Sequence, residues 1–257
     1  MGEKTIMHYS SSQKILLVGE GNFSFAACLA KEFGSAVKMV ATSFDSKESL
    51  MQKYSNVMST LNELKGKGCT VLHDVDVHTI SQHPRLTNRR FDRIVFNFPH
   101  AGFILMEHNK IQIKLHQDLV KGYFTSAREM LTESGEVHVT HKTTHPFSKW
   151  NIVKLAEEVG LFLVEEAQFT RADYPGYINK KGSGRKCNRT FRVGQCSTYK
   201  FAKLPLQLNK PASELGHFSL RSFHLAENLP PYKINLLDGR QLFLSVVDPN
   251  CLWGIAN

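Results

Sequence analysis

The sequence lacks any apolar run as long as a membrane span, which needs about 20 residues. Its five cysteines are odd in number and form no C-x-x-C pair, so neither a disulfide framework nor a zinc ribbon is indicated. The start, MGEKTIMHYSSS, has no apolar signal-peptide core and no Ser or Thr at position 6 for myristoylation. We therefore expect a soluble intracellular protein with free thiols and no membrane partner.

Acidic residues are in the minority, with 23 Asp and Glu against 32 Lys and Arg, and the formal net charge is +9. Such an excess favours a polyanionic partner. The 257 residues, 42% of them hydrophobic, suffice for one large α/β domain with a full core and a small appendage. No metal site is predicted, because Asp74 and Asp76 lack a third ligand of convincing spacing, and His138 and His141 point to opposite faces of a strand.

The most informative stretch is Lys14–Phe25, KILLVGEGNFSF. Ile15–Val18 is a short apolar run typical of a buried parallel strand, and the residues Gly19–Phe25, here called the glycine turn, lead into a helix-forming segment. Strand, glycine turn and helix are typical of a nucleotide-binding α/β domain. Ser24 replaces the third glycine of a dinucleotide fingerprint, and no P-loop ending is present. This pattern alone leaves S-adenosylmethionine, a dinucleotide cofactor and a purely structural turn open.

Acidic side chains occur where the next two predicted strands end. The strand Ala36–Phe44 is followed by Asp45, whose carboxylate can accept hydrogen bonds from two ribose hydroxyls at once. Alternatively, Asp45 caps the predicted helix 46–64. In the strand Cys69–Val77, Asp74 and Asp76 share one face, and a carboxylate there can accept a hydrogen bond from an adenine amino group.

A second informative motif, Asn97-Phe98-Pro99-His100, follows the predicted strand Phe91–Phe96. It falls at the carboxyl edge, where such sheets open their binding crevice. Asn97 can offer a donor and an acceptor to a base edge, Phe98 can stack on the base, and Pro99 stiffens the loop. The alternative is an ordinary proline turn.

The positive charge is concentrated in Arg171–Lys200, here called the basic segment, which contains eight basic residues and one acidic residue. Basic residues interleaved with aromatic ones are typical of binding to single-stranded nucleic acid. The predicted RNA-binding residues are Arg171, Tyr174, Tyr177, Lys180, Lys181, Arg185, Lys186, Arg189 and Arg192. Alternatively, the segment is a solvated charged loop without a ligand. If the strand Cys196–Lys203 pairs with the strand Leu161–Phe169, the segment lies at the cofactor edge.

The remaining pattern predicts a helix over Asn109–Leu131, a strand over Gly135–Thr140 and a helix over Ser148–Val159. We expect residues 1–13 to be frayed and one domain over residues 13–203. Residues 204–257 are expected to form a small β appendage, with a hairpin over Ile234–Val247 around Asp238-Gly239, or to be partly disordered.

Several of these motifs resemble, in the same order, the Rossmann-type domain of the eukaryotic 25S rRNA (uridine-N3)-methyltransferase family, most closely its plant members. The resemblance covers roughly residues 13–202. The motifs that carry it are KILLVGEGNFSFAACLA, Asp45, the VDV of 75–77, FDRIVFNFPHAG, GEVHVTHK, SKWNIVKLAEEVGL and DYPGY followed by FRVGQCSTYKF.

The resemblance implies a Rossmann-like class I methyltransferase fold, in which a seven-stranded, mostly parallel sheet has an antiparallel last strand. It also implies S-adenosylmethionine as cofactor, rRNA or a pre-ribosomal particle as partner, and a nucleolar or nuclear location, otherwise a cytoplasmic one. The implied cofactor residues are Gly19, Glu20, Gly21, Asn22, Phe23, Ser24 and Phe25 for the methionine part, Asp45 for the ribose, Asp76 and Val77 for the adenine, and Asn97, Phe98 and Pro99 beside the methyl group.

The predicted catalytic residues are Asn97 and His100. His100 is the nearest titratable residue by sequence, and its ordinary pKa suits removal of the uracil N3 proton near neutral pH. Alternatively, Asn97 and backbone carbonyls only orient the base, and solvent takes the proton. Two other functions stay open: a non-catalytic RNA-binding or ribosome-assembly protein that keeps the fold, and a nicotinamide oxidoreductase, which Ser24 disfavours.

Overall fold

The computed structural model describes residues 2–203, 232–235 and 241–244. The chain divides into two units, Met1–Pro205 and Leu206–Asn257. In the second unit, β10 (Tyr232–Asn235) and β11 (Gln241–Leu244) pair in antiparallel fashion. The turn predicted at Asp238-Gly239 and the remainder of the predicted appendage lie outside the described residues.

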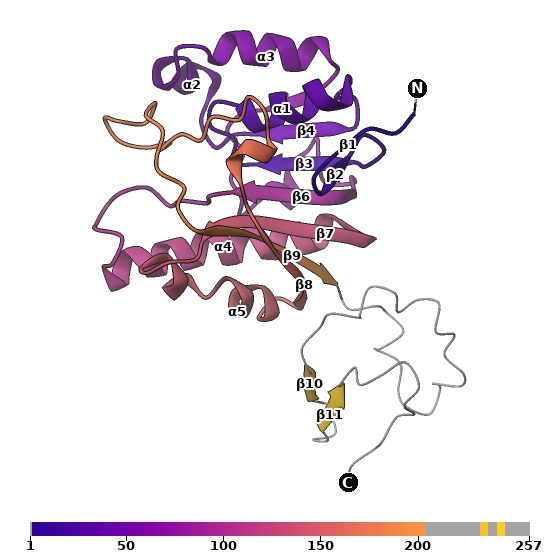
Figure 1. The fold of residues 1–257 in the computed structure, drawn as a ribbon, viewed down its shortest axis with the longest axis vertical. Coiled ribbons are helices and arrows are strands. Elements are labelled where there is room, and N and C mark those ends of the chain that lie inside the picture. The colour runs from indigo at the N-terminus through magenta and orange to yellow at the C-terminus, as the bar shows by residue number, and fades with distance from the viewer. Residues whose placement is uncertain (1, 204–231, 236–240, 245–257) are drawn as a thin grey trace. The chain divides into compact units, whose positions relative to one another are not determined.

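A seven-stranded sheet forms the centre of the first unit (Figure 1). Across the sheet the order is β5 (Thr70–Leu72), β4 (Met39–Thr42), β3 (Ile15–Val18), β6 (Phe91–Asn97), β7 (Leu131–Lys142), β9 (Cys196–Lys203) and β8 (Leu161–Gln168). The neighbours from β5 to β7 pair in parallel, and β9 is antiparallel to both β7 and β8. This arrangement confirms the predicted mostly parallel sheet with an antiparallel last strand.

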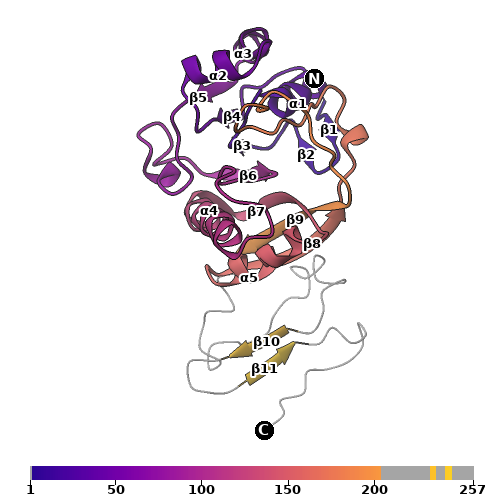
Figure 2. The ribbon, with the colours of Figure 1, turned by 90° about the vertical axis from the view of Figure 1, so that its left-hand side faces the viewer.

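Helices cover both faces of the sheet, as Figure 2 shows. One face carries α1 (Ser24–Phe33), α2 (Lys47–Lys53) and α3 (Val57–Gly66), and the other carries α4 (Lys110–Met130) and α5 (Ile152–Glu157). Short 3-10 turns are η1 (Ile80–Gln82), η2 (Phe147–Trp150) and η3 (Arg171–Asp173). The strands are apolar on both sides: Ile15 and Leu17 pack toward α1, whereas Leu16 and Val18 pack toward α4.

Two predicted helices are each interrupted. The stretch 46–64 forms α2 and α3 rather than one helix, because Tyr54 leaves the helical conformation at φ −134° and is buried to 2% exposure. The stretch 148–159 is broken at Asn151, which has a left-handed φ of 53°. Just before the break, Trp150 is buried and stacks on His116 of α4, with ring centroids 4.2 Å apart.

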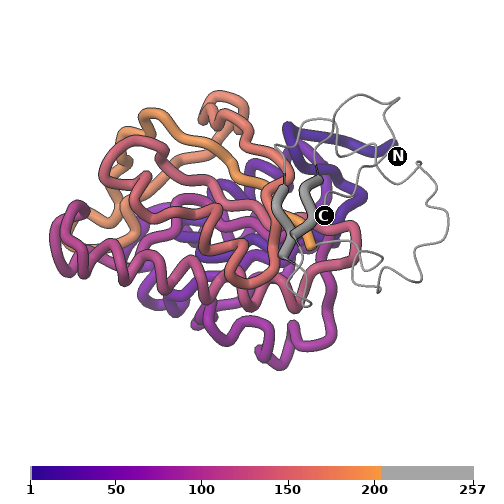
Figure 3. Tube along the Cα trace, turned by 90° about the horizontal axis from the view of Figure 1, so that it is seen from below, coloured from indigo at the N-terminus to yellow at the C-terminus, as the bar shows by residue number. Residues whose placement is uncertain are grey.

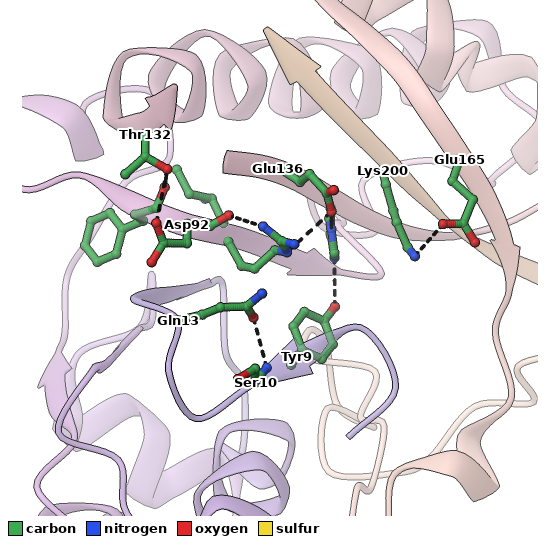
Figure 4. Close-up of polar contacts among 12 residues, drawn as sticks. Tyr9, Ser10, Gln13, Asp92, Thr132, Glu136, Glu165 and Lys200 are labelled. Carbon is green, nitrogen blue, oxygen red and sulfur yellow. Dashed lines mark hydrogen bonds and ion pairs between the residues drawn. The ribbon is translucent and has the colours of Figure 1, made fainter. Parts of the chain in front are cut away.

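The expectation that the N-terminus is frayed is wrong. The strands β1 (Thr5–Ile6) and β2 (Tyr9–Ser10) form a hairpin on the face opposite α4 (Figure 2). The Tyr9 hydroxyl lies 3.2 Å from Nδ1 of the buried His138, whose Nε2 lies 2.9 Å from Oε2 of Glu136 (Figure 4). Tyr9 is itself 2% exposed, so the hairpin contributes to the core.

Lys200 belongs to the same face of the sheet and not to an RNA surface. It is 7% exposed, and its Nζ lies 2.7 Å from Oε2 of Glu165 on β8 (Figure 4). The exposed charge of the basic segment therefore lies in its loop residues before β9.

Stability should fall on acidification because of His138. Burial lowers the pKa of His138 to about 4, although its hydrogen bond to Glu136 opposes this effect. Between pH 6.5 and 4 the unfolded chain binds a proton that the native state does not, so the free energy of unfolding decreases as the pH falls through this range.

Urea denaturation at pH 7 and pH 5 measures this dependence. At about 1.4 kcal/mol per pH unit, His138 accounts for at most about 2 kcal/mol of the decrease. His138→Gln should remove that part, whereas His108→Gln, at an exposed site, should behave as wild type. An unchanged decrease in His138→Gln would contradict the assignment.

Candidate functional site

The two glycines of the glycine turn are required by the packing of the protein itself. Gly19 has a φ of +66°, and a Cβ there would lie 2.3 Å from the Phe96 ring. A Cβ at Gly21 would lie 2.9 Å from the hydroxyl of the buried Tyr54. The turn thus fits closely between β6 and the end of α2, which explains glycine at both positions.

Three other side chains of the turn, those of Glu20, Phe23 and Phe25, are buried. Phe23 and Phe25 are 0% and 1% exposed, so only their backbone can face a ligand. Glu20 is also buried, and its Oε2 accepts a hydrogen bond from the Ala26 N–H at 3.4 Å. Burial raises the pKa of Glu20 to about 7, against the opposing effect of this hydrogen bond. We conclude that the turn offers a ligand chiefly its backbone.

Asp45 follows β4 with its carboxylate partly exposed. Its Oδ1 accepts from Ser49 Oγ at 3.1 Å and pairs with Lys53 Nζ at 2.5 Å. Ser46, rather than Asp45, caps α2, because Ser46 Oγ accepts from the Ser49 N–H at 3.1 Å. Within the described part of the chain both side-chain contacts of Asp45 fall on Oδ1, which leaves Oδ2 as an acceptor for a hydroxyl.

Asp76 and Val77 differ in what they can offer. Asp76 is exposed, and its Oδ1 accepts from the His78 N–H at 2.9 Å. It lines a hollow of about 300 Å³ together with Asp74, Val75, Thr79, Ile80, Gln82, His83 and Pro84. Val77 is 5% exposed and belongs to the core, so its side chain is not available to a ligand.

Asn97 ends β6 at the carboxyl edge of the sheet. Its Oδ1 is buried and has no hydrogen-bond partner among the described residues, a costly state that a ligand donor would relieve. Phe98 has a left-handed φ of 49°, which is uncommon outside glycine. Its ring makes T-shaped contacts with Phe169 and Phe191, with centroids 5.5 and 5.3 Å away, and Phe98 is partly buried.

His100, Glu107 and His116 form a hydrogen-bonded group, here called the clamp, that the sequence did not predict. Nδ1 of His100 accepts from the Gly102 N–H at 3.0 Å, and its Nε2 lies 2.8 Å from Glu107 Oε1. His116 is arranged alike: Nδ1 accepts from the Ala101 N–H at 3.1 Å, and Nε2 lies 3.3 Å from Glu107 Oε2. In neutral His100 the proton therefore sits on Nε2, facing the carboxylate, whereas Nε2 of His116 also lies 3.0 Å from Nε2 of Gln112.

The clamp bears on the predicted role of His100 as the base and on the prediction that there is no metal site. Burial raises the pKa of Glu107, but hydrogen bonds from His100 and His116 outweigh it and lower the pKa to about 2. Both ring nitrogens of His100 are engaged within the protein, which disfavours its predicted role as the base. The ligand atoms of the three side chains lie within 4.8 Å of one another, as in a cation site. However, a metal on Nε2 would need the proton on Nδ1, which faces a backbone N–H in each ring.

The basic segment docks directly on the glycine turn. The Ile178 N–H donates to Ser24 Oγ at 3.0 Å, and the Ile178 carbonyl accepts from Asn22 Nδ2 at 3.2 Å. Two side chains that were expected to hold the cofactor thus hold the basic segment. The second hollow, of about 300 Å³, lies here and is lined by Asn22, Ser24, Ala27, Cys28, Lys31, Tyr54, Asn56, Val57, Thr60, Glu63, Pro175, Gly176, Ile178, Lys180 and Asn188.

The tyrosines of the basic segment anchor it. Tyr174 is 3% exposed and stacks on Phe169 with centroids 5.5 Å apart, which contradicts a role in stacking on bases. Tyr177 meets Phe25 edge-on at 5.2 Å. Lys180 Nζ bonds the Asn188 carbonyl at 2.7 Å, and Lys181 is partly buried. The exposed basic side chains are Arg171, Arg185, Lys186, Arg189 and Arg192.

Ser24→Ala should loosen the basic segment, because Ser24 Oγ is the acceptor for the Ile178 N–H. Losing a hydrogen bond of about 1 kcal/mol raises the population of the open segment about fivefold. Trypsin should therefore cleave the native protein several-fold faster at the Lys and Arg residues between Lys180 and Arg192. Thr125→Ala, on an exposed turn of α4, should leave the cleavage rate unchanged. Equal rates for wild type and Ser24→Ala would refute the anchoring role.

Comparison with known proteins adds a family match. A family model described as "rRNA (uridine-N3-)-methyltransferase BTM5-like" matches residues 16–181, which include the glycine turn, Asp45, Asp76 and Asn97. An uncharacterized protein of Arabidopsis thaliana is 52% identical over 206 residues, covering 79% of this chain and 99% of that protein.

Two further relatives are longer than the chain. Heavy metal-associated isoprenylated plant protein 41 of Arabidopsis thaliana is 44% identical over 92% of this chain, which spans 45% of that protein. The 25S rRNA (uridine(2634)-N(3))-methyltransferase of Saccharomyces cerevisiae is 23% identical, covering 70% of this chain and 69% of that protein.

Within the described ranges, no helix combines the length and apolarity needed to cross a membrane.

Proposed function

The chain belongs to the BMT5-like rRNA (uridine-N3-)-methyltransferase family, and on that premise we propose that it transfers a methyl group from S-adenosylmethionine to N3 of a uridine in large-subunit rRNA. The observation that carries the proposal is the contact of Ile178 with Asn22 and Ser24. It joins the most basic part of the chain to the sheet edge that bears Asp45, Asp76 and Asn97.

The acceptors at that edge fit the donor groups of an adenosyl cofactor. Oδ2 of Asp45 would accept from the ribose hydroxyls, and the exposed carboxylate of Asp76 would accept from the adenine amino group. The backbone of Gly19, Glu20 and Gly21 would hold the methionine part. When bound, S-adenosylmethionine supplies an electrophilic methyl group on a sulfonium sulfur.

Asn97 orients the target base. Its amide presents an unpartnered acceptor and a donor to the edge of uracil that carries N3. Because both nitrogens of His100 are engaged, solvent takes the N3 proton, and His100 fixes the loop after Asn97. Alignment of the base is thus the main contribution of these residues. The family also suggests a pre-ribosomal particle as partner and the nucleolus or nucleus as the location.

Titration calorimetry with S-adenosylmethionine tests the cofactor site. Asp45→Ala removes the ribose acceptor, and a hydrogen bond to a charged group contributes about 1.5–3 kcal/mol, so affinity should fall at least about tenfold. Asp118→Ala, which loses an exposed carboxylate on α4, should bind as wild type does. Binding of NAD without binding of S-adenosylmethionine would overturn the proposed function.

The salt dependence of RNA binding tests the basic segment. Arg185→Gln combined with Lys186→Gln removes two exposed charges of the basic segment. For single-stranded RNA the slope of log K against log salt should become shallower by about 1.4, since each phosphate contact contributes about 0.7.

A matched control removes one Lys and one Arg from the opposite, amino edge of the sheet. Lys14 and Arg90 are exposed and directly precede β3 and β6. Lys14→Gln combined with Arg90→Gln should retain the wild-type slope. Equal slopes for the two double variants would show that the basic segment does not contact the RNA.

A further inference from the structure

The loop after the Asn97 motif displays four consecutive apolar side chains to solvent. Phe103, Ile104, Leu105 and Met106, here called the apolar loop, are 49%, 71%, 39% and 73% exposed. Scattered exposed apolar residues are ordinary, but a contiguous group at the edge of a site indicates binding. The group begins six residues after Asn97.

The backbone of the apolar loop is held rigidly. Gln112, which is 0% exposed, accepts from the N–H groups of Ile104 and Leu105 at 3.2 and 2.8 Å. Its Nε2 donates to the Gly102 carbonyl at 2.8 Å, and the clamp around Glu107 fixes both ends of the loop. The loop therefore presents its side chains on a preorganised backbone, as a binding element does.

The apolar loop and the basic segment lie at the same end of the sheet. In Figures 1 and 3 the connection between β6 and α4 and the orange trace of the basic segment occupy one end of the first unit. Phe191 of the basic segment contacts Phe98 at 5.3 Å, and Lys142 Nζ lies 5.1 Å from the centroid of the Phe191 ring. Asn97 thus has the basic segment on one side and leads into the apolar loop on the other.

The charge around the apolar loop suits a polyanion. Glu107 is the single acidic residue between positions 98 and 113, and its carboxylate is engaged by His100 and His116. Lys110 is exposed at the start of α4. This flank of the apolar loop therefore carries one engaged carboxylate and one exposed ammonium group.

We propose that the apolar loop is a wedge, whose exposed Ile104 and Met106 enter the RNA base stack at the place that the target uridine leaves. This inference rests on the proposed function. N3 lies on the pairing edge of uracil, so a base inside a helix must leave its pair and its stack to reach Asn97. Proteins that unstack duplex DNA insert apolar side chains between base steps, and the apolar loop offers such side chains.

The test uses an rRNA hairpin that contains the segment around the uridine named for the yeast relative, with that uridine paired and 2-aminopurine beside it. Unstacking raises 2-aminopurine fluorescence whether or not methyl transfer occurs. Wild type with S-adenosylhomocysteine should raise the signal several-fold, and Ile104→Ala combined with Met106→Ala should give less than half of that rise at saturating protein.

A matched control truncates two exposed apolar residues elsewhere, Met7→Ala combined with Val37→Ala, and should behave as wild type. Methylation of the paired hairpin should be at least tenfold slower in the loop variant, and methylation of a single-stranded RNA with the same uridine should stay within twofold of wild type. Equal fluorescence in the loop variant and wild type, or an equal loss on both RNAs, would overturn the wedge and favour a protein-docking or general binding role. Absence of methylation by wild type would refute the proposed function, and the fluorescence comparison would still decide the wedge.

Discussion

The arrangement of the site depends on the hydrogen bonds between the backbone of Ile178 and the side chains of Asn22 and Ser24. They join residues 154 and more positions apart in the sequence. Because the N–H and the carbonyl of Ile178 are both engaged, the basic segment is fixed against the start of α1. The glycine turn and the basic segment, which are far apart in the sequence, are thereby held side by side.

Aromatic packing between the basic segment and the core stabilises this contact. Tyr174 and Tyr177 pack against Phe25 and Phe169, so the basic segment has an apolar underside that belongs to the core and a charged outer side. The same division holds on the other side of Asn97, where buried Gln112 and His116 hold the apolar loop. Both flanks of Asn97 are therefore preorganised before any RNA binds.

The sequence was sufficient for the sheet and for the parts of the site that follow strands directly. Apolar runs and glycines predicted β3 and β6, the family resemblance implied the antiparallel last strand, and the position of Asp45 after β4 followed from local pattern. The extent of the domain over residues 13–203 stays a prediction.

Contacts between distant segments could not be predicted in this way. The burial of Tyr174 and the hydrogen bonds of His100 were not predicted, because composition does not show which side of a loop a ring occupies or which groups form its hydrogen bonds. His100 and Glu107 lie on a loop and His116 lies on α4, and they come together only because the loop folds back on the helix. No periodic sequence pattern indicates such a contact. The N-terminal hairpin was missed because the stretch is mostly polar and its two buried residues, Tyr9 and Ser10, form no apolar pattern.

Hydrogen–deuterium exchange with and without saturating S-adenosylhomocysteine tests most directly whether the glycine turn and the basic segment form one site. The account predicts slower exchange at Gly19–Phe25 and, in the same titration, at the peptide that contains Ile178. Protection of the glycine turn without any change around Ile178, or of neither stretch, would contradict it.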